Sequence, residues 1–272
     1  MRKANEVLEI IEQSSVEKGT ARAGKLFLLA VLAGAYIALG SQASAVASFH
    51  FADDPETYGL AKLASAVVFP VGLMMVTFCG AELFTGNCLM VTGLLDKKIT
   101  ASQLLRNWVI VYIGNFAGSL LIAAMIGYSG LWESGDGLLG AMTVKTAISK
   151  VSLPFGRALV LGILCNWLVC LAVWMAAAAK DATGKILAIF FCIGLFVLSG
   201  FEHSVANMYF IPAGIMASAN DAFVSLRGLD ASVLTVGNFL LRNLLPVTLG
   251  NMIGGAVFVG MSGWFAYKKQ GN

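Results

Sequence analysis

Glu202 and His203 stand side by side within a long apolar run, residues 186–215. An ionisable side chain at membrane depth costs free energy, so by default it marks a functional site. An imidazole can donate a hydrogen bond to a small anion, and in its protonated form it can also give a proton to a weak-acid anion. The pair therefore suggests recognition or protonation of a small anion. The alternative is a buried histidine that a neighbouring group satisfies.

A second polar interruption lies in another apolar run, at residues 80–87, which read Gly-Ala-Glu-Leu-Phe-Thr-Gly-Asn. Non-helical backbone at this depth is tolerated only where it is buried in protein or lines a cavity. Two broken helices that meet at the midplane would place Thr85 opposite His203. Glu82 and Glu202 each lie near the start of a break, where a carboxylate can cap free N–H groups, so we expect a structural role for both.

The composition is that of a polytopic membrane protein. Only 12% of the 272 residues are charged and 58% are hydrophobic, whereas soluble domains carry about 25% charged residues. The net charge of +3 gives no indication of nucleic-acid binding. All five cysteines lie in apolar runs without metal-ligand spacing, so we expect no disulfide framework, no metal site and no cofactor.

Six apolar stretches predict six membrane spans. The spans cover about residues 26–49, 60–95, 107–128, 158–178, 186–215 and 239–267, and the regions 129–150 and 217–236 are expected to be loops. The second and fifth stretches are too long and too polar for one straight helix, so we expect them to be broken. Pro246 is expected to interrupt the sixth.

The ends of the chain have a separate interpretation. Residues 1–25 predict an amphipathic helix at the membrane surface, 26–267 a single transmembrane domain and 268–272 a short tail. A signal peptide at 26–39 is disfavoured because 25 residues of mixed charge precede it. Six spans place both termini on one side; twelve Lys and Arg fall there and six on the other side. The positive-inside rule therefore predicts cytoplasmic termini.

The chain contains an internal repeat. Three residues of the third span, Asn107, Asn115 and Gly118, recur 136 positions later in the sixth span as Asn243, Asn251 and Gly254. The two break glutamates are 120 positions apart. An odd number of spans in each half forces opposite orientations. The expected fold is therefore an all-α membrane protein with two inverted three-helix repeats, an arrangement that places a transport path near the midplane.

Four segments resemble the formate/nitrite transporter family, and the similarity covers nearly the whole chain. These segments are residues 80–87, 200–208 (Gly-Phe-Glu-His-Ser-Val-Ala-Asn-Met), 166–172 and 246–251. The resemblance implies an aquaporin-like fold, a homopentamer with one path per protomer, and a place in the cell (inner) membrane. It also implies transport without enzymatic activity, of small monovalent anions such as formate, nitrite, hydrosulfide, acetate or lactate.

The resemblance also implies roles for individual residues. His203 and Thr85 match the central pair of the path, and Asn166 matches a lining position. Lys150 matches a vestibule lysine that attracts anions, with Lys25 as its less securely aligned inner counterpart. The residues that match one constriction are Leu73, Leu83, Val169 and Asn251, and those that match the other are Phe69 and Phe196.

Several alternatives stay open. Phe201 and the runs at 209–212 and 245–248 look closer to formate-type than to nitrite-type members, but nitrite and hydrosulfide remain candidate substrates. The permeating species is either the anion or the neutral acid. An aquaporin-like channel for neutral solutes is a different class. A haem-bearing redox anchor is disfavoured because His50 and His203, the only histidines, lie at different depths.

Overall fold

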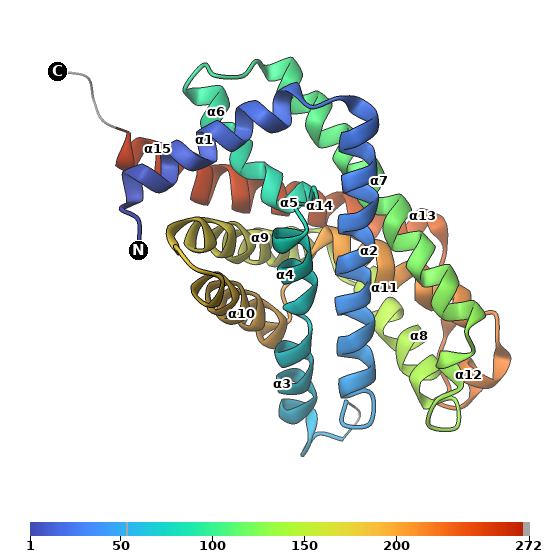
Figure 1. Cartoon of the computed structure of the whole chain (residues 1–272). Coiled ribbons are helices and arrows are strands. Elements are labelled where there is room, and N and C mark those ends of the chain that lie inside the picture. Colours follow the sequence, from blue (N-terminus) through green and yellow to red (C-terminus); the bar gives the residue numbers. More distant parts are fainter. Residues whose placement is uncertain (53, 269–272) are drawn as a thin grey trace.

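The computed structural model describes residues 1–52 and 54–268, which form helices joined by short loops (Figure 1). Within these residues six helices are long and apolar enough to cross a membrane: Ala23–Ser48, Tyr58–Phe78, Ala101–Tyr128, Phe155–Ala178, Ala182–Ser199 and Val236–Tyr267. Two shorter apolar helices, Phe84–Leu95 and Ser204–Ala217, complete the second and fifth stretches. The predicted all-helical class with two broken spans is confirmed.

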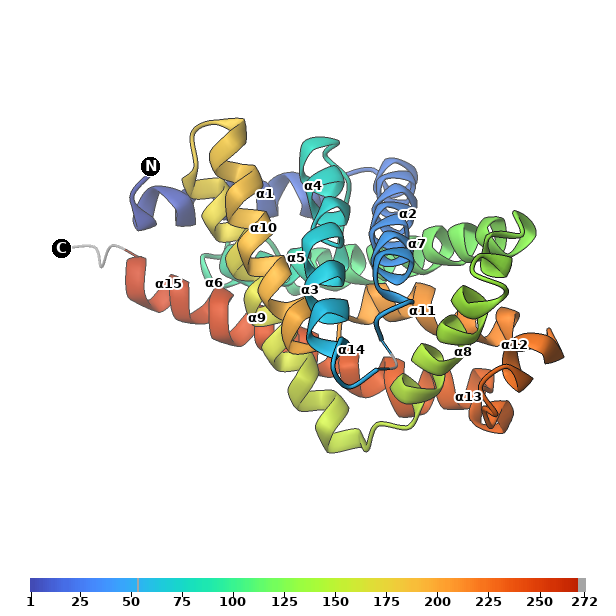
Figure 2. The ribbon, with the colours of Figure 1, turned by 90° about the horizontal axis from the view of Figure 1, so that it is seen from below.

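The two halves of the chain supply similar sets of helices. The first half contains α1 (Ala4–Thr20), α2 (Ala23–Ser48), α3 (Tyr58–Val68), α4 (Val71–Phe78), α5 (Phe84–Asn87), α6 (Val91–Leu95) and α7 (Ala101–Tyr128). The second contains α8 (Leu138–Val151), α9 (Phe155–Ala178), α10 (Ala182–Ser199), α11 (Ser204–Ala217), α12 (Asp221–Ser225), α13 (Val236–Asn238), α14 (Leu245–Met252) and α15 (Ser262–Tyr267). The broken spans lie against each other, because α10 packs along α3 and α4 (Figure 2).

A glycine ends the helix before each break. Gly80 follows α4 with φ +65° and Gly200 follows α10 with φ +75°, a left-handed conformation that residues with a Cβ adopt only at a cost. The first break is shorter than predicted, because residues 84–87 are already helical in α5. The N–H of Glu82 then donates to Leu29 O (3.2 Å), and that of Glu202 to Leu161 O (3.3 Å).

The matched glycines of the third and sixth spans bring helix backbones into contact. A Cβ on Gly118 of α7 would lie 1.9 Å from the carbonyl oxygen of Val31 in α2. A Cβ on Gly254 would lie 2.2 Å from the carbonyl oxygen of Ile163 in α9. Only glycine fits both crossings, as expected where membrane helices pack closely through small residues. The two crossings are equivalent, with residue numbers shifted by 136 in one helix and 132 in the other.

Several predicted boundaries are wrong. The third span begins at Ala101, not at residue 107, because Thr100 caps it and Gln103 completes a capping box. The sixth runs from Val236 to Tyr267 without a break. Its Pro246 lies in the first turn of α14, directly after a π-helical stretch, where the missing N–H is tolerated.

The regions expected to be loops also contain helices. Residues 217–236 contain α12, and residues 129–150 contain most of α8. α8 is the counterpart of α1, since a shift of 132 positions superimposes Lys18 near the end of α1 on Lys150 near the end of α8. Each repeat is therefore larger than three spans, because a short helix precedes its first span. The sequence pattern concealed this, because α8 carries polar residues between its apolar ones.

α1 lies across one end of the bundle and packs on α6, α7, α9 and α15 (Figure 1). It buries Val7, Leu8 and Ile11 and, less expectedly, the carboxylate of Glu12. Of the predicted tail at 268–272, only Lys268 lies within the described residues.

Candidate transport path

His203 and Thr85 meet at the centre of the molecule. Thr85 Oγ1 lies 3.0 Å from His203 Nε2, and the two residues are 0% and 3% exposed. His203 is also the N-cap of α11, where its Nδ1 accepts a hydrogen bond from the Ala206 N–H at 3.0 Å. Because Nδ1 is an acceptor, the proton of the neutral imidazole is on Nε2. The ring therefore donates toward Thr85 Oγ1, and the threonine hydroxyl hydrogen stays available for another acceptor.

The central contact does not join equivalent positions of the two breaks. Leu83 is the N-cap residue of α5 and His203 that of α11, 120 positions apart. By the same shift Thr85 corresponds to Val205. The first break therefore offers leucine, not Thr85, at the position of the histidine, so the central polar contact joins non-equivalent positions.

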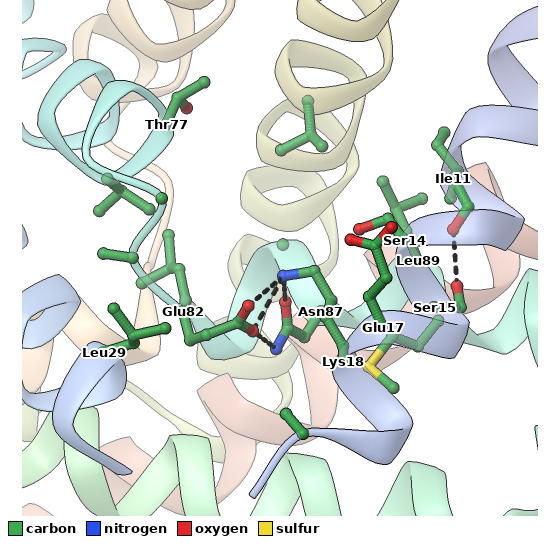
Figure 3. A pocket seen from close by; sticks show the side chains of 18 of the residues that line it. Ile11, Ser14, Ser15, Glu17, Lys18, Leu29, Thr77, Glu82, Asn87 and Leu89 are labelled. Carbon is green, nitrogen blue, oxygen red and sulfur yellow. Dashed lines mark hydrogen bonds and ion pairs between the residues drawn. The ribbon is translucent and has the colours of Figure 1, made fainter. Parts of the chain in front are cut away.

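A lysine, the break glutamate and two asparagines form a polar cluster beside the first break. Figure 3 shows three of them, Lys18, Glu82 and Asn87. Lys18 Nζ donates to both carboxylate oxygens of Glu82, each at 2.9 Å, and to Asn87 Oδ1 at 2.8 Å. The Asn87 amide donates to Glu82 Oε2 (2.7 Å) and to Asn107 Oδ1 (2.9 Å). The carboxylate thus has the partners that a buried charge requires.

The same cluster recurs beside the second break. Lys150 Nζ donates to Glu202 Oε1 at 2.7 Å, and the Asn207 amide donates to Glu202 Oε2 at 2.6 Å and to Asn243 Oδ1 at 2.7 Å. The four residue types and their order match those of the first cluster. Each carboxylate ties its break to neighbouring helices, and the structural role of Glu82 and Glu202 stays a prediction.

One asparagine holds the backbone of each break. The Asn115 amide donates to Ala30 O and Glu82 O, and its Oδ1 accepts from the Phe84 N–H at 2.9 Å. Asn251 makes the equivalent bonds to Gly162 O, Glu202 O and the Ser204 N–H. Each asparagine thus satisfies backbone groups that the broken helix leaves open.

Two cavities approach the central pair from opposite sides. The N-terminal vestibule, of about 470 Å³, is walled partly by α1 (Figure 3). Its lining includes Lys18, Lys25, Leu73 and Leu83. The second cavity, which we call the lysine vestibule, has about 480 Å³. Its lining includes Lys62, Lys145, Lys150, Phe69, Phe196 and His203. The leucine and phenylalanine pairs predicted as constrictions thus separate into different cavities.

The two phenylalanines border His203. The rings of Phe69 and Phe196 meet edge to face with centroids 5.4 Å apart, and Phe196 stacks on the His203 ring at 5.9 Å. Val169 is 1% exposed. The Asn166 amide donates to Thr85 O (3.1 Å) and Asn251 O (2.7 Å). Asn166 is therefore placed next to the central pair, while the Asn251 side chain is engaged in holding its break.

Sequence reasoning missed part of this arrangement. The counterpart of Lys150 is Lys18, not Lys25, because Lys18 binds the break glutamate of its own half as Lys150 does. Lys25 also lines the N-terminal vestibule but is exposed. The sequence does contain evidence that Lys18 corresponds to Lys150, since the two are separated by the same 132 positions that relate α2 to α9. Asn87 and Asn207 are related by the same shift of 120 positions as the two break glutamates, which also indicates that the two clusters correspond.

Six candidate membrane helices in two inverted halves, with a buried polar pair between two cavities, define a polytopic membrane channel or transporter. In the described residues no cluster of His, Cys, Asp and Glu side chains has the arrangement of a metal site. The sequence matches the formate/nitrite transporter family over residues 5–265, and the chain belongs to this family.

Relatives of known name share this similarity over most of their length. The probable formate transporter of Methanothermobacter thermautotrophicus is 42% identical over 267 residues, 93% of this chain and 92% of that protein. The formate channel FocA of Escherichia coli K12 is 38% identical over 267 residues, 96% of this chain and 93% of that protein. A solved pentameric formate channel with formate bound has a TM-score of 0.81 at 37% identity, covering 91% of this chain and 98% of that one.

Proposed function

We propose that this protein transports formate, or a similar small monovalent weak-acid anion, through a path between the two vestibules. The observation that carries the proposal is the buried contact between Thr85 and His203, which lies where two cavities approach each other inside an otherwise apolar bundle. Relatives that share about 40% identity over nearly the full chain are named formate channels or transporters. We propose transport without catalysis.

In this proposal an anion is attracted into a vestibule by lysine charge, including Lys150 and Lys25, and sheds water where the walls become apolar. Leu73, Leu83 and Val169 form the apolar ring on one side of the centre. Phe69 and Phe196 form the ring on the other side. Asn166 and Asn251 hold the walls in place through their bonds to the breaks.

The centre then supplies two hydrogen-bond donors to a carboxylate: the His203 Nε2–H and the Thr85 hydroxyl. A second proton on the ring would have to occupy Nδ1, where it would face the Ala206 N–H. His203 therefore acts as a neutral hydrogen-bond donor, and any coupled proton travels with the substrate. Of the two open mechanisms, this geometry disfavours direct protonation of the anion by the imidazole.

We further propose a homopentamer in the cytoplasmic (inner) membrane with both termini in the cytoplasm. The solved formate channel that resembles this chain is pentameric, and the distribution of Lys and Arg favours this orientation. The N-terminal vestibule then faces the cytoplasm and the lysine vestibule faces the exterior.

Proteoliposomes loaded with the purified protein test the transport proposal directly. Uptake of labelled formate, nitrite, lactate and glycerol is measured at two pH values against protein-free vesicles. We expect saturable formate flux well above that of glycerol. Fast glycerol flux without anion flux would replace the proposal with a neutral-solute channel. Nitrite faster than formate would keep the anion path and reassign its substrate.

A further inference from the structure

The two vestibules differ in charge although their polar clusters match. The charged side chains that line the N-terminal vestibule are Glu17, Lys18, Lys25 and Glu82, two of each sign. Those described for the lysine vestibule are Lys62, Lys145, Lys150 and Glu202, three basic and one acidic. The repeat thus reproduces the scaffold at both ends but not the charge.

Lys150 alone does not account for the positive charge. Its ammonium lies 2.7 Å from the carboxylate of Glu202, which offsets part of its field at the mouth of the cavity, so Lys150 attracts an anion mainly at short range. Lys62, in contrast, has no acidic partner: within residues 1–52 and 54–268 its ammonium forms no ion pair. Its Nζ lies over the face of the Tyr58 ring, 5.6 Å from the ring centroid. Because no carboxylate in the described part of the chain offsets its field, this ammonium can attract a passing anion.

Lys62 lies on the same helix face as Phe69, one of the two phenylalanines that border His203. Lys62, Ser65 and Phe69 are spaced i, i+3 and i+7, so they lie on one face of the second span, where Phe69 is the C-cap residue of α3, and all three line the same cavity. At 1.5 Å per residue, Lys62 stands about 10 Å from Phe69 along this face. Its Nζ also lies 3.0 Å from where a Cβ of Gly200 would be, at the start of the second break. The lysine therefore lies in the same cavity as Phe69 and Phe196, on the side away from the centre.

We propose that Lys62 is a recruitment site for small carboxylate anions at the mouth of the lysine vestibule, and that it makes this mouth more attractive to anions than the opposite one. The position equivalent to Lys62 in the second half is Ala182, so the other mouth lacks it. The inference rests on the proposed anion transport. It adds a residue that acts before the substrate reaches the constriction.

A charge that only raises the local anion concentration affects transport in a specific way. One unit charge about 10 Å away in water changes the local concentration of a monovalent anion by about twofold. The effect therefore appears at subsaturating formate and disappears at saturating formate. It also weakens as salt shortens the Debye length from about 30 Å at 0.01 M to about 8 Å at 0.15 M. A purely structural role for Lys62 would not produce this combination.

The test uses proteoliposomes of zwitterionic lipid with wild-type protein and the variants Lys62→Arg, Lys62→Met and Lys62→Glu. Lys180→Met is the control, because it removes an exposed lysine that lines neither vestibule. Initial uptake of labelled formate is measured at subsaturating and saturating concentrations, in low and in high salt. Size-exclusion profiles verify that every variant retains its assembly.

We expect Lys62→Met to lower the subsaturating rate in low salt by about twofold and Lys62→Glu by about fourfold. Lys62→Arg and Lys180→Met should match wild type, and all rates should converge in high salt and at saturation. Equal subsaturating rates for wild type and Lys62→Glu in low salt would overturn the role of Lys62 while leaving the transport proposal intact. Absence of formate flux in the wild type would overturn both.

Discussion

The two breaks share one scaffold and differ in the side chains that they place at the centre. In each break a lysine, a glutamate and two asparagines form the same cluster, and one asparagine clamps the broken backbone through the same three bonds. The N-cap residue differs, since it is leucine at 83 and histidine at 203. The comparison indicates that building a break and placing chemistry in it are separate tasks. The scaffold that builds a break occurs in both halves, whereas the histidine occurs only in the second.

The largest expected effect comes from the shared scaffold. Replacing Asn115 or Asn251 by leucine, a residue of similar size, removes three hydrogen bonds and leaves two carbonyls and one N–H without that partner in each case. At about 1–3 kcal/mol for each buried unsatisfied group, either change costs several kcal/mol. We expect a large and similar loss of thermal stability for both variants in detergent, measured by differential scanning fluorimetry.

Asn238→Leu is the control for this experiment, because Asn238 donates its amide to a carbonyl outside the breaks, Val233 O. It should change the unfolding temperature much less. If one clamp variant were as stable as wild type while the other unfolded, the two breaks would not share a scaffold in the sense argued above.

The second prediction concerns the feature that differs. His203→Leu gives the second break the N-cap residue that the first already has, and removes the Nε2–H donor together with the acceptor for Ala206 N–H. A hydrogen bond to a charged group contributes about 1.5–3 kcal/mol, so we expect formate flux to fall by about 10- to 100-fold. The measurement is uptake at saturating formate.

The matched variant is Leu83→Met, which changes the equivalent position in the first break without adding or removing a donor. Its flux should stay within about threefold of wild type, as for other volume-conserving apolar changes. Equal losses in the two variants would mean that the histidine serves only as an N-cap, and the asymmetry would have no chemical meaning.

The sequence was sufficient for the broken spans because glycine, a buried charge and excess length coincide there. The family resemblance to residues 200–208 placed Thr85 and His203 together, and the structure brings these side chains within 3.0 Å. Leu83 and His203 are related by the same shift of 120 positions as Glu82 and Glu202, but an apolar leucine in an apolar run gives no signal that would match it to a histidine.

Other features depend on tertiary contacts that a pattern does not carry. α8 was expected to be a loop because Lys145 and Lys150 interrupt its apolar residues, but its buried face packs on α11. Glu12 read as one more acid in a polar N-terminal segment, yet it is 1% exposed. Its partners, Lys98 and Lys268, are too far away in the sequence for periodicity to connect them.

The smallest expected effect concerns a difference in how α1 and its counterpart α8 are held on the bundle. Both helices bury apolar residues, but α1 also buries a carboxylate, Glu12, which belongs to a cluster of charged side chains. Lys98 Nζ lies 2.5 Å from Glu12 Oε2 and 3.0 Å from Asp96 Oδ2, and Lys268 pairs with both acids. Although burial raises it, hydrogen bonds from Lys268 and Lys98 lower the pKa of Asp96 to about 2.

The sign of the pH effect follows from that shift. Asp96 has a pKa of about 3.9 when unfolded, so its contribution is fully present above about pH 4 and is lost as the pH falls toward 2. Lys268→Met weakens the same cluster at neutral pH. Partly exposed ion pairs contribute only about 0.2–1 kcal/mol each, so we expect amide hydrogen exchange over residues 4–20 to rise by about threefold, with no change over 138–151.

Lys185→Met is the control, since it removes a half-buried lysine at the start of α10 that takes no part in this cluster. Exchange in α1 should then match wild type at neutral pH. Acidification to pH 3 should lower the protection factor of α1, which is the intrinsic exchange rate at that pH divided by the observed rate, in wild type more than in Lys268→Met, which has already lost part of the cluster. An equal loss of protection in α1 and α8 would show that acid loosens the whole bundle, and the proposed difference in how the two helices are fastened would be wrong.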